Sequence, residues 1–180
     1  LHLSIRRQRQ MCIRDSPLAA VSTTETIESK LHDDHFTYYT SHVSDPLLAE
    51  VGLAVLRVIA DEQLVERANV MGAHLRHRLE GLQQKYEQIG DIRGAGLLLG
   101  VELVTDRSSR NAAHQLGGLT TRKCFDYGLS MNIRRRPERG SVWRIAPPLT
   151  VSAAEIDRAV EILDRALRES LDELSRSRTT

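Results

Sequence analysis

The chain has 180 residues, 41% of them hydrophobic and 27% charged, with 25 basic and 24 acidic residues and a net charge of +1. This length suffices for one domain with its own core or for part of a larger protein, and the balanced charge does not indicate a nucleic-acid-binding protein. No apolar run approaches the roughly 20 residues of a membrane helix. The two cysteines, Cys12 and Cys124, have neither metal-binding nor disulfide spacing, which favours a cytoplasmic protein.

The first sixteen residues, LHLSIRRQRQMCIRDS, contain four arginines and one aspartate and show no hydrophobic periodicity. We interpret residues 1–16 as a non-native or disordered tag. A transit peptide, which would be rich in Arg and Ser, is the alternative. Taking those four basic residues and one acidic residue from the totals leaves 21 and 23, a net charge of −2. The basic excess therefore belongs to this segment.

Residues 17–60 begin with a short strand-like run, LAAVSTT, and a polar helix-like piece that ends near His32. Residues 37–45 are rich in β-forming residues and are predicted to be extended. Asp45 and Pro46 together predict a helix start, with an acidic N-cap followed by proline at the first helical position. The helix that follows is apolar on nearly all sides, so we expect it to be buried.

The next predicted helix begins at Asp61 and continues to about Tyr86, with apolar residues on one side only. This pattern is typical of an amphipathic surface helix. Residues 89–104, IGDIRGAGLLLGVELV, predict a turn that leads into one buried strand. The RGAG sequence at 93–96 lacks the spacing of a phosphate-binding loop, so it favours a tight crossing of two backbone segments.

The C-terminal third predicts a helix over residues 111–127 and strands at 129–133 and 142–146. The basic run Arg134–Arg136 is expected in a solvated loop between these strands, with an acidic ligand as the alternative. Ser152 and Glu155 form a capping box at the start of the last helix, with Val151 and Ile156 as its hydrophobic staple. The order of elements predicts an α/β chain: residues 17–60 end one domain, and residues 61–180 form a small α+β domain.

Two groups of residues have side chains suited to binding. Arg144 lies between Trp143 and Ile145 in a strand directed to a core, where a guanidinium needs an acidic partner. That partner is either an internal carboxylate or a bound anion. Ser41, Val43 and Asp45 alternate along an extended segment and so offer oxygen atoms on one side, which suits a cation; the alternative is that Asp45 only caps a helix.

Several segments of the chain together resemble one known enzyme family, the class III, fold type I PLP-dependent aminotransferases, and within it the 2,2-dialkylglycine decarboxylases. The segments are FTYYTSHVSDPLLAEVGLAVL, LVERANVMGAHLRHRLEGL, IGDIRGAGLLLGVELV, GLSMNI and WRIAPPLTVSAAEID. The resemblance covers nearly all of residues 17–171. It implies that residues 17–60 end the PLP-binding large domain and that residues 61–180 form the small C-terminal domain.

The resemblance also implies roles for individual residues. The family arginine that binds the substrate carboxylate corresponds to Arg144. Tyr39 and Ser41 would lie near the PLP of a neighbouring subunit, in a homodimer or homotetramer. Ser41, the carbonyl of Val43 and the carboxylate of Asp45 would hold an alkali cation, K⁺ or Na⁺. The family usually has threonine where this chain has Ser41, which leaves the cation preference open. The substrates would be amino and keto acids, with no role for nucleic acid or membranes.

The chain departs from the family at the residue that would carry the chemistry. The Schiff-base lysine corresponds to Gln10, so the chain contains no catalytic residue of its own and is expected to be inactive alone. In the complete enzyme we expect decarboxylating transamination of 2,2-dialkylglycines. Transamination of acetylornithine or ω-amino acids is the alternative within the family. A different alternative is a non-catalytic α/β interaction domain that binds a partner through helices 46–60 and 62–86.

Overall fold

The computed structural model describes residues 7–9, 19–21, 23–37, 46–136 and 140–177. The chain divides into two compact units, Leu1–Glu62 and Gln63–Thr180. The division lies two residues from the boundary predicted between residues 60 and 61. The assignment of the two units to a large and a small domain of one enzyme stays a prediction.

The first unit contains two short strands and two helices. Strand β1 (Arg7–Arg9) pairs antiparallel with β2 (Ala19–Val21), followed by α1 (Glu25–Asp33) and α2 (Pro46–Asp61). Arg7–Arg9 is the described part of residues 1–16, and the interpretation of this segment as a non-native or disordered tag stays a prediction. The predicted helix start at Pro46 is confirmed, whereas Asp45 lies outside the described residues.

The expectation that α2 is buried is wrong. Gly52 is the one buried residue of this helix, and Leu47 and Leu56 are 72% and 57% exposed. An apolar helix is buried only where a second layer covers it, and the other described elements of this first unit, β1, β2 and α1, do not form such a layer over α2. Within the described ranges, no helix is both long enough and apolar enough to cross a membrane.

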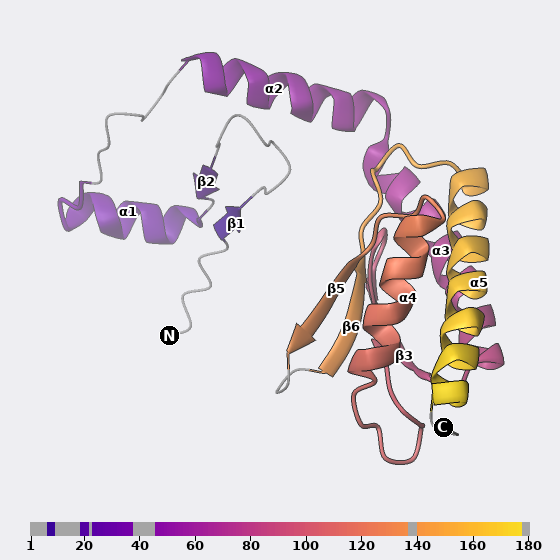
Figure 1. Ribbon diagram of the computed structural model, residues 1–180. Helices are drawn as coiled ribbons and strands as arrows, with labels where there is room; N and C mark the ends of the chain where they lie inside the picture. The colour runs from indigo at the N-terminus through magenta and orange to yellow at the C-terminus, as the bar shows by residue number, and fades with distance from the viewer. Residues whose placement is uncertain (1–6, 10–18, 22, 38–45, 137–139, 178–180) are drawn as a thin grey trace. The chain divides into compact units, whose positions relative to one another are not determined.

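The second unit is a four-stranded antiparallel sheet with three helices against one face (Figure 1). The strands follow the order β3-β4-β6-β5, so the strand that carries Arg144 is internal. In chain order the elements are α3 (Leu64–Lys85), β3 (Ile89–Ala95), β4 (Leu98–Leu103), α4 (His114–Asp126), β5 (Asn132–Arg136), β6 (Gly140–Ile145) and α5 (Ala153–Ser177). This arrangement agrees with the predicted α/β class.

The core lies between the covered face of the sheet and the three helices. Val101 in β4 and Trp143 in β6 are directly opposite each other and fully buried. The indole Nε1 of Trp143 donates a hydrogen bond to Thr121 Oγ1 on α4 at 3.0 Å, so the polar atom of this large side chain is satisfied. The helices contribute Leu79 from α3 and Leu167 from α5. The amphipathic pattern predicted for the helix after Asp61 is confirmed, although α3 begins at Leu64 and Asp61 still belongs to α2.

Residues 89–104 form a hairpin of two strands, where the sequence predicted one strand after a turn. The chain reverses between β3 and β4 because Gly94 and Gly96 have φ angles of +135° and +52°, which glycine adopts without strain. Gly96 also contacts α3 closely: a Cβ atom added at Gly72 would lie 2.3 Å from the carbonyl carbon of Gly96. The predicted tight backbone crossing at 93–96 is therefore confirmed.

The start of α5 has the predicted capping box. Ser152 N donates to Glu155 Oε2 at 2.8 Å, and Glu155 N donates to Ser152 Oγ at 3.3 Å. Val151 and Ile156 are both buried in the same core. The hydrogen bonds from Ser152 lower the pKa of Glu155, as expected for a carboxylate that accepts two donors. Arg134–Arg136 are in strand β5 and not in the predicted loop, because β5 extends to Arg136 in register with Gly140.

A carboxylate on α5 connects this helix to the C-terminal end of α3. Asp164 accepts hydrogen bonds from Lys85 Nζ at 2.7 Å and from Tyr86 Oη at 2.6 Å. Partial burial acts to raise the pKa of Asp164, but the bonds from Lys85 and Tyr86 outweigh it and keep the pKa below its ordinary value. A carboxylate with a lowered pKa stabilises the fold above its unfolded pKa, and this contribution is lost as the pH falls through the folded pKa.

Replacement of Asp164 by asparagine should therefore lower the free energy of unfolding at pH 7 by about 1 kcal/mol. The difference from wild type should shrink as the pH falls below about 4, where the wild-type carboxylate also becomes protonated. Urea unfolding followed by the fluorescence of Trp143, the only tryptophan, measures both values. Asp172→Asn is the control, because Asp172 is exposed on the same helix and its carboxylate bonds to no described residue. An equal loss in both variants would contradict this role of Asp164.

Candidate functional site

The candidate site is centred on Arg144, on the face of the sheet opposite helices α3, α4 and α5. In the antiparallel register Arg144 lies opposite Gly100 of β4 and Asn132 of β5, and Gly100 lies opposite Arg93 of β3. Directly opposed residues point to the same side of a sheet. Arg93, Gly100, Arg144 and Asn132 therefore form one row across this face, which we call the Arg144 row.

The residues that alternate with this row fix its position. Ile92, Val101, Trp143 and Ile133 form the parallel row on the covered face of the sheet. Trp143 is fully buried, whereas the next residue, Arg144, is exposed. The sequence suggested that Arg144 is directed into the core, and this expectation is wrong. Side chains alternate between the two faces of a strand, so Arg144 points to the face opposite Trp143. Its backbone is held on both sides by neighbouring strands.

Acidic residues on this face are engaged by other arginines. Arg93 Nη1 lies 2.7 Å from Asp91 Oδ2, and Arg110 Nη2 lies 3.0 Å from Glu102 Oε2. Arg144, in contrast, makes no hydrogen bond or ion pair with any residue that the structure describes. The internal ion pair considered for Arg144 is therefore not found among the described residues. Its side chain is exposed, and its backbone is paired on both sides.

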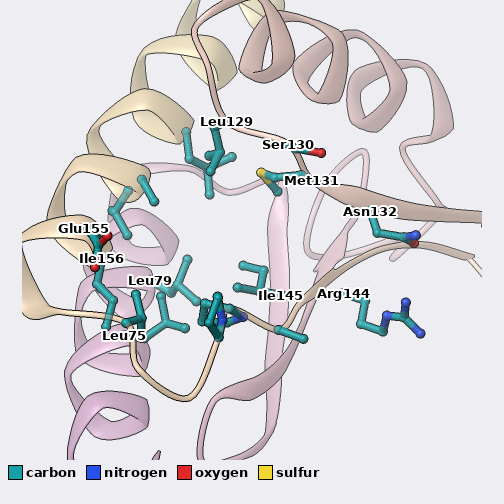
Figure 2. Close-up of a pocket in the computed structure, with 17 residues that line it drawn as sticks. Leu75, Leu79, Leu129, Ser130, Met131, Asn132, Arg144, Ile145, Glu155 and Ile156 are labelled. Atoms are coloured by element: carbon teal, nitrogen blue, oxygen red, sulfur yellow. The ribbon is translucent and has the colours of Figure 1, made fainter. Parts of the chain in front are cut away.

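A cavity of about 490 Å³ lies beside Arg144, between the end of the sheet and helices α3 and α5. Its lining is mostly aliphatic, with Leu75, Leu79, Ile145 and Ile156 among its residues. Figure 2 shows the guanidinium of Arg144 lying away from this aliphatic group. The cavity is therefore an apolar neighbour of the Arg144 guanidinium.

The lysines of the chain do not fit the requirements of a covalent PLP site. Such a site needs an amine that loses its proton readily. Lys85 Nζ lies 2.7 Å from Asp164, and Lys123 Nζ lies 2.9 Å from Glu173. Hydrogen bonds to these carboxylates raise the pKa of both lysines, which keeps them protonated. The third lysine, Lys30, is exposed on α1, a helix without buried residues.

The other residues assigned by the resemblance lie outside the described part of the chain. These are Gln10, Tyr39, Ser41, Val43 and Asp45. Their predicted roles near PLP and an alkali cation stay predictions. Among the described residues, no group of three or more His, Cys, Asp or Glu side chains is placed to hold a metal ion.

Sequence reasoning found Arg144 but not its neighbours in the row. Asn132 and Arg144 are each six positions in the sequence from Glu138. A hairpin centred on residues 137–140 would therefore have predicted their pairing. Gly100 has no comparable signal, because β4 was not separated from β3 in the prediction. The pairing of Gly100 with Arg144 depends on a contact between segments more than 40 residues apart in the sequence.

Comparisons with known proteins agree on one family. The model of the family described as aminotransferase class-III matches residues 16–167. An uncharacterized aminotransferase of Schizosaccharomyces pombe is 43% identical over 160 residues, which are 89% of this chain and 36% of that protein. A mitochondrial alanine–glyoxylate aminotransferase 2 homologue of Arabidopsis thaliana is 37% identical over 153 residues, 84% of this chain and 31% of that protein.

Solved structures give the same result. A structure from a study of transaminase evolution by ancestral reconstruction has a TM-score of 0.78 and 26% identity, and covers 89% of this chain and 36% of that chain. This chain therefore spans about a third of the length of the relatives that it matches.

Proposed function

The chain belongs to the class III aminotransferase family, and from that premise we propose that it is the substrate-binding C-terminal portion of a PLP-dependent enzyme. In this proposal Arg144 binds the carboxylate of an amino-acid or keto-acid substrate. The observation that carries it is that Arg144 is exposed and without an acidic partner among the described residues, while Arg93 and Arg110 on the same face are paired.

The chemistry of arginine suits this role. A guanidinium presents parallel N–H donors that match the two oxygens of a carboxylate, and such bidentate pairs are stronger and more directional than single hydrogen bonds. Pairing on both sides of β6 keeps the base of the side chain in place, which reduces the entropy lost when a ligand binds. A fixed carboxylate also fixes the orientation of the bond that reacts.

The proposal divides the reaction between this chain and residues that it does not contain. PLP supplies the electron-withdrawing group in this family when it is bound. By resemblance its lysine corresponds to Gln10, and neither Lys85 nor Lys123 is suited to replace it. We therefore expect the 180-residue chain alone to bind carboxylates without transaminating them.

The proposed substrates are 2,2-dialkylglycines, which the complete enzyme would decarboxylate and transaminate. Support comes from the resemblance of the SHVSDP and LSMNI segments to that branch of the family. The same branch suggests an alkali cation at Ser41, Val43 and Asp45, and a homo-oligomer in which Tyr39 and Ser41 approach the PLP of a neighbouring subunit. Transamination of acetylornithine or an ω-amino acid is the alternative.

Sequencing the source DNA across the codons for residues 1–20 tests the proposed relation to a complete enzyme. We expect the reading frame to continue upstream, with lysine at position 10. The enzyme encoded by that frame should then release CO₂ from 2-aminoisobutyrate, measured as trapped gas, and should react more slowly with acetylornithine. Turnover of acetylornithine without CO₂ release would favour the alternative substrate class. Confirmation of Gln10 in the genome would instead limit the function to carboxylate binding.

A further inference from the structure

We propose that Asn132 is a second specificity-determining residue of this site, whose side-chain amide donates a hydrogen bond to the carboxylate that Arg144 binds. This inference rests on the proposed function of Arg144 and extends it to a residue to which the family resemblance assigned no role. It follows from the pairing of β5 with β6, from the exposure of Asn132 and from the chemistry of its amide.

The register brings the two side chains together. Asn132 and Arg144 are directly opposite each other in the antiparallel pair, so their side chains emerge on the same face. Figure 2 shows Asn132 on β5 and Arg144 on β6, each from its own strand. Cβ atoms of such opposed residues lie about 4.5–5.5 Å apart, within reach of one carboxylate group. Both residues border the same cavity.

Asn132 and Arg144 both lie on paired strands, and both side chains are exposed. Ile133 and Trp143, which follow and precede them, turn to the covered face, and Trp143 is fully buried. Asn132 is exposed, and its amide makes no hydrogen bond with a described residue. An exposed amide on a paired strand therefore has donor capacity that a ligand can use without breaking an existing bond.

The chemistry of the two groups is complementary. A carboxylate accepts about four hydrogen bonds, and a bidentate arginine occupies two of these positions. The Nδ2 group of Asn132 can donate to one of the remaining positions. A neutral amide also leaves the positive charge of Arg144 available, whereas an aspartate at 132 would form an internal ion pair and block the site. On the other side of Arg144, Gly100 has no side chain, which leaves room for the ligand.

The test uses the full 180-residue chain, labelled with ¹⁵N and titrated with 2-aminoisobutyrate. Isopropylamine is the ligand control, because it is the same amine with hydrogen in place of the carboxylate. We expect the Arg144 Nε and Asn132 Nδ2 signals to shift with 2-aminoisobutyrate and not with isopropylamine. Asn132→Ala should raise the apparent Kd roughly threefold to tenfold, the effect of one lost hydrogen bond, and Asn132→Asp should raise it further.

Asn111→Ala is the matched control, because Asn111 is exposed in a loop away from the Arg144 row, and its Kd should equal that of wild type. If Arg144→Ala abolishes binding while Asn132→Ala binds normally and Nδ2 does not shift, the inference about Asn132 is wrong and the proposed function stands. If Arg144→Ala binds as well as wild type, the proposed function itself is wrong. Absence of any shift in the wild-type chain at saturating ligand would overturn both.

Discussion

Replacement of Arg144 by lysine should raise the KM of the complete enzyme for carboxylate substrates about tenfold to a hundredfold, because a charge-assisted bidentate contact contributes about 1.5–3 kcal/mol. Lysine keeps the positive charge but presents one compact ammonium group in place of a planar fork. No acidic group among the described residues holds Arg144, so the substitution breaks no internal ion pair there. The PLP content, measured by absorbance, should stay unchanged.

Arg93→Lys is the matched control for this prediction. Arg93 is in the same row and also carries a positive charge, but Asp91 holds its guanidinium at 2.7 Å. We expect its KM to stay within about twofold of wild type, since exposed ion pairs contribute little. An unchanged KM in Arg144→Lys would contradict the carboxylate-binding role, and an equal rise in both variants would indicate a general effect of charge on this face.

Replacement of Gly72 by alanine should lower the free energy of unfolding by about 3 kcal/mol, near the upper end of the effect of overpacking. The added Cβ would lie 2.3 Å from the carbonyl carbon and 2.4 Å from the carbonyl oxygen of Gly96. These are backbone atoms of the turn between β3 and β4, which cannot rotate away as a flexible side chain would. Helix α3 would have to move away from the hairpin, and Leu75 and Leu79 would lose packing contacts in the core.

Gly81→Ala, on the same helix, should change the free energy of unfolding in the opposite direction. A Cβ at Gly81 would meet no atom within 4 Å. Alanine should therefore stabilise the fold by up to about 1 kcal/mol, the difference in helix propensity between the two residues. Urea unfolding followed by Trp143 fluorescence measures both variants. Changes of the same sign in Gly72→Ala and Gly81→Ala would show that the crossing with Gly96 does not control the stability of this unit.

The sequence alone predicted those elements whose signals lie within a few residues of one another. The capping box of Ser152 and Glu155, the start of α2 at Pro46 and the apolar side of α3 were all identified from local spacing. Such features can be identified because a cap or an amphipathic face depends on neighbours within one or two helical turns. Arg144 was also identified, from its place in an apolar strand and from the family resemblance.

Only the tertiary structure decided what surrounds these elements. The exposure of α2 depends on whether another layer covers it, which its own apolar sequence cannot indicate. Residues 89–104, predicted as one strand, form a hairpin in the structure, because the two halves of this segment pair with each other around Gly94 and Gly96. Arg144 lies between Gly100 and Asn132, opposite the covered face, because register joins three strands that are distant in the chain. Register and covering layers arise from contacts between such distant segments, and local sequence patterns do not specify which segments will meet.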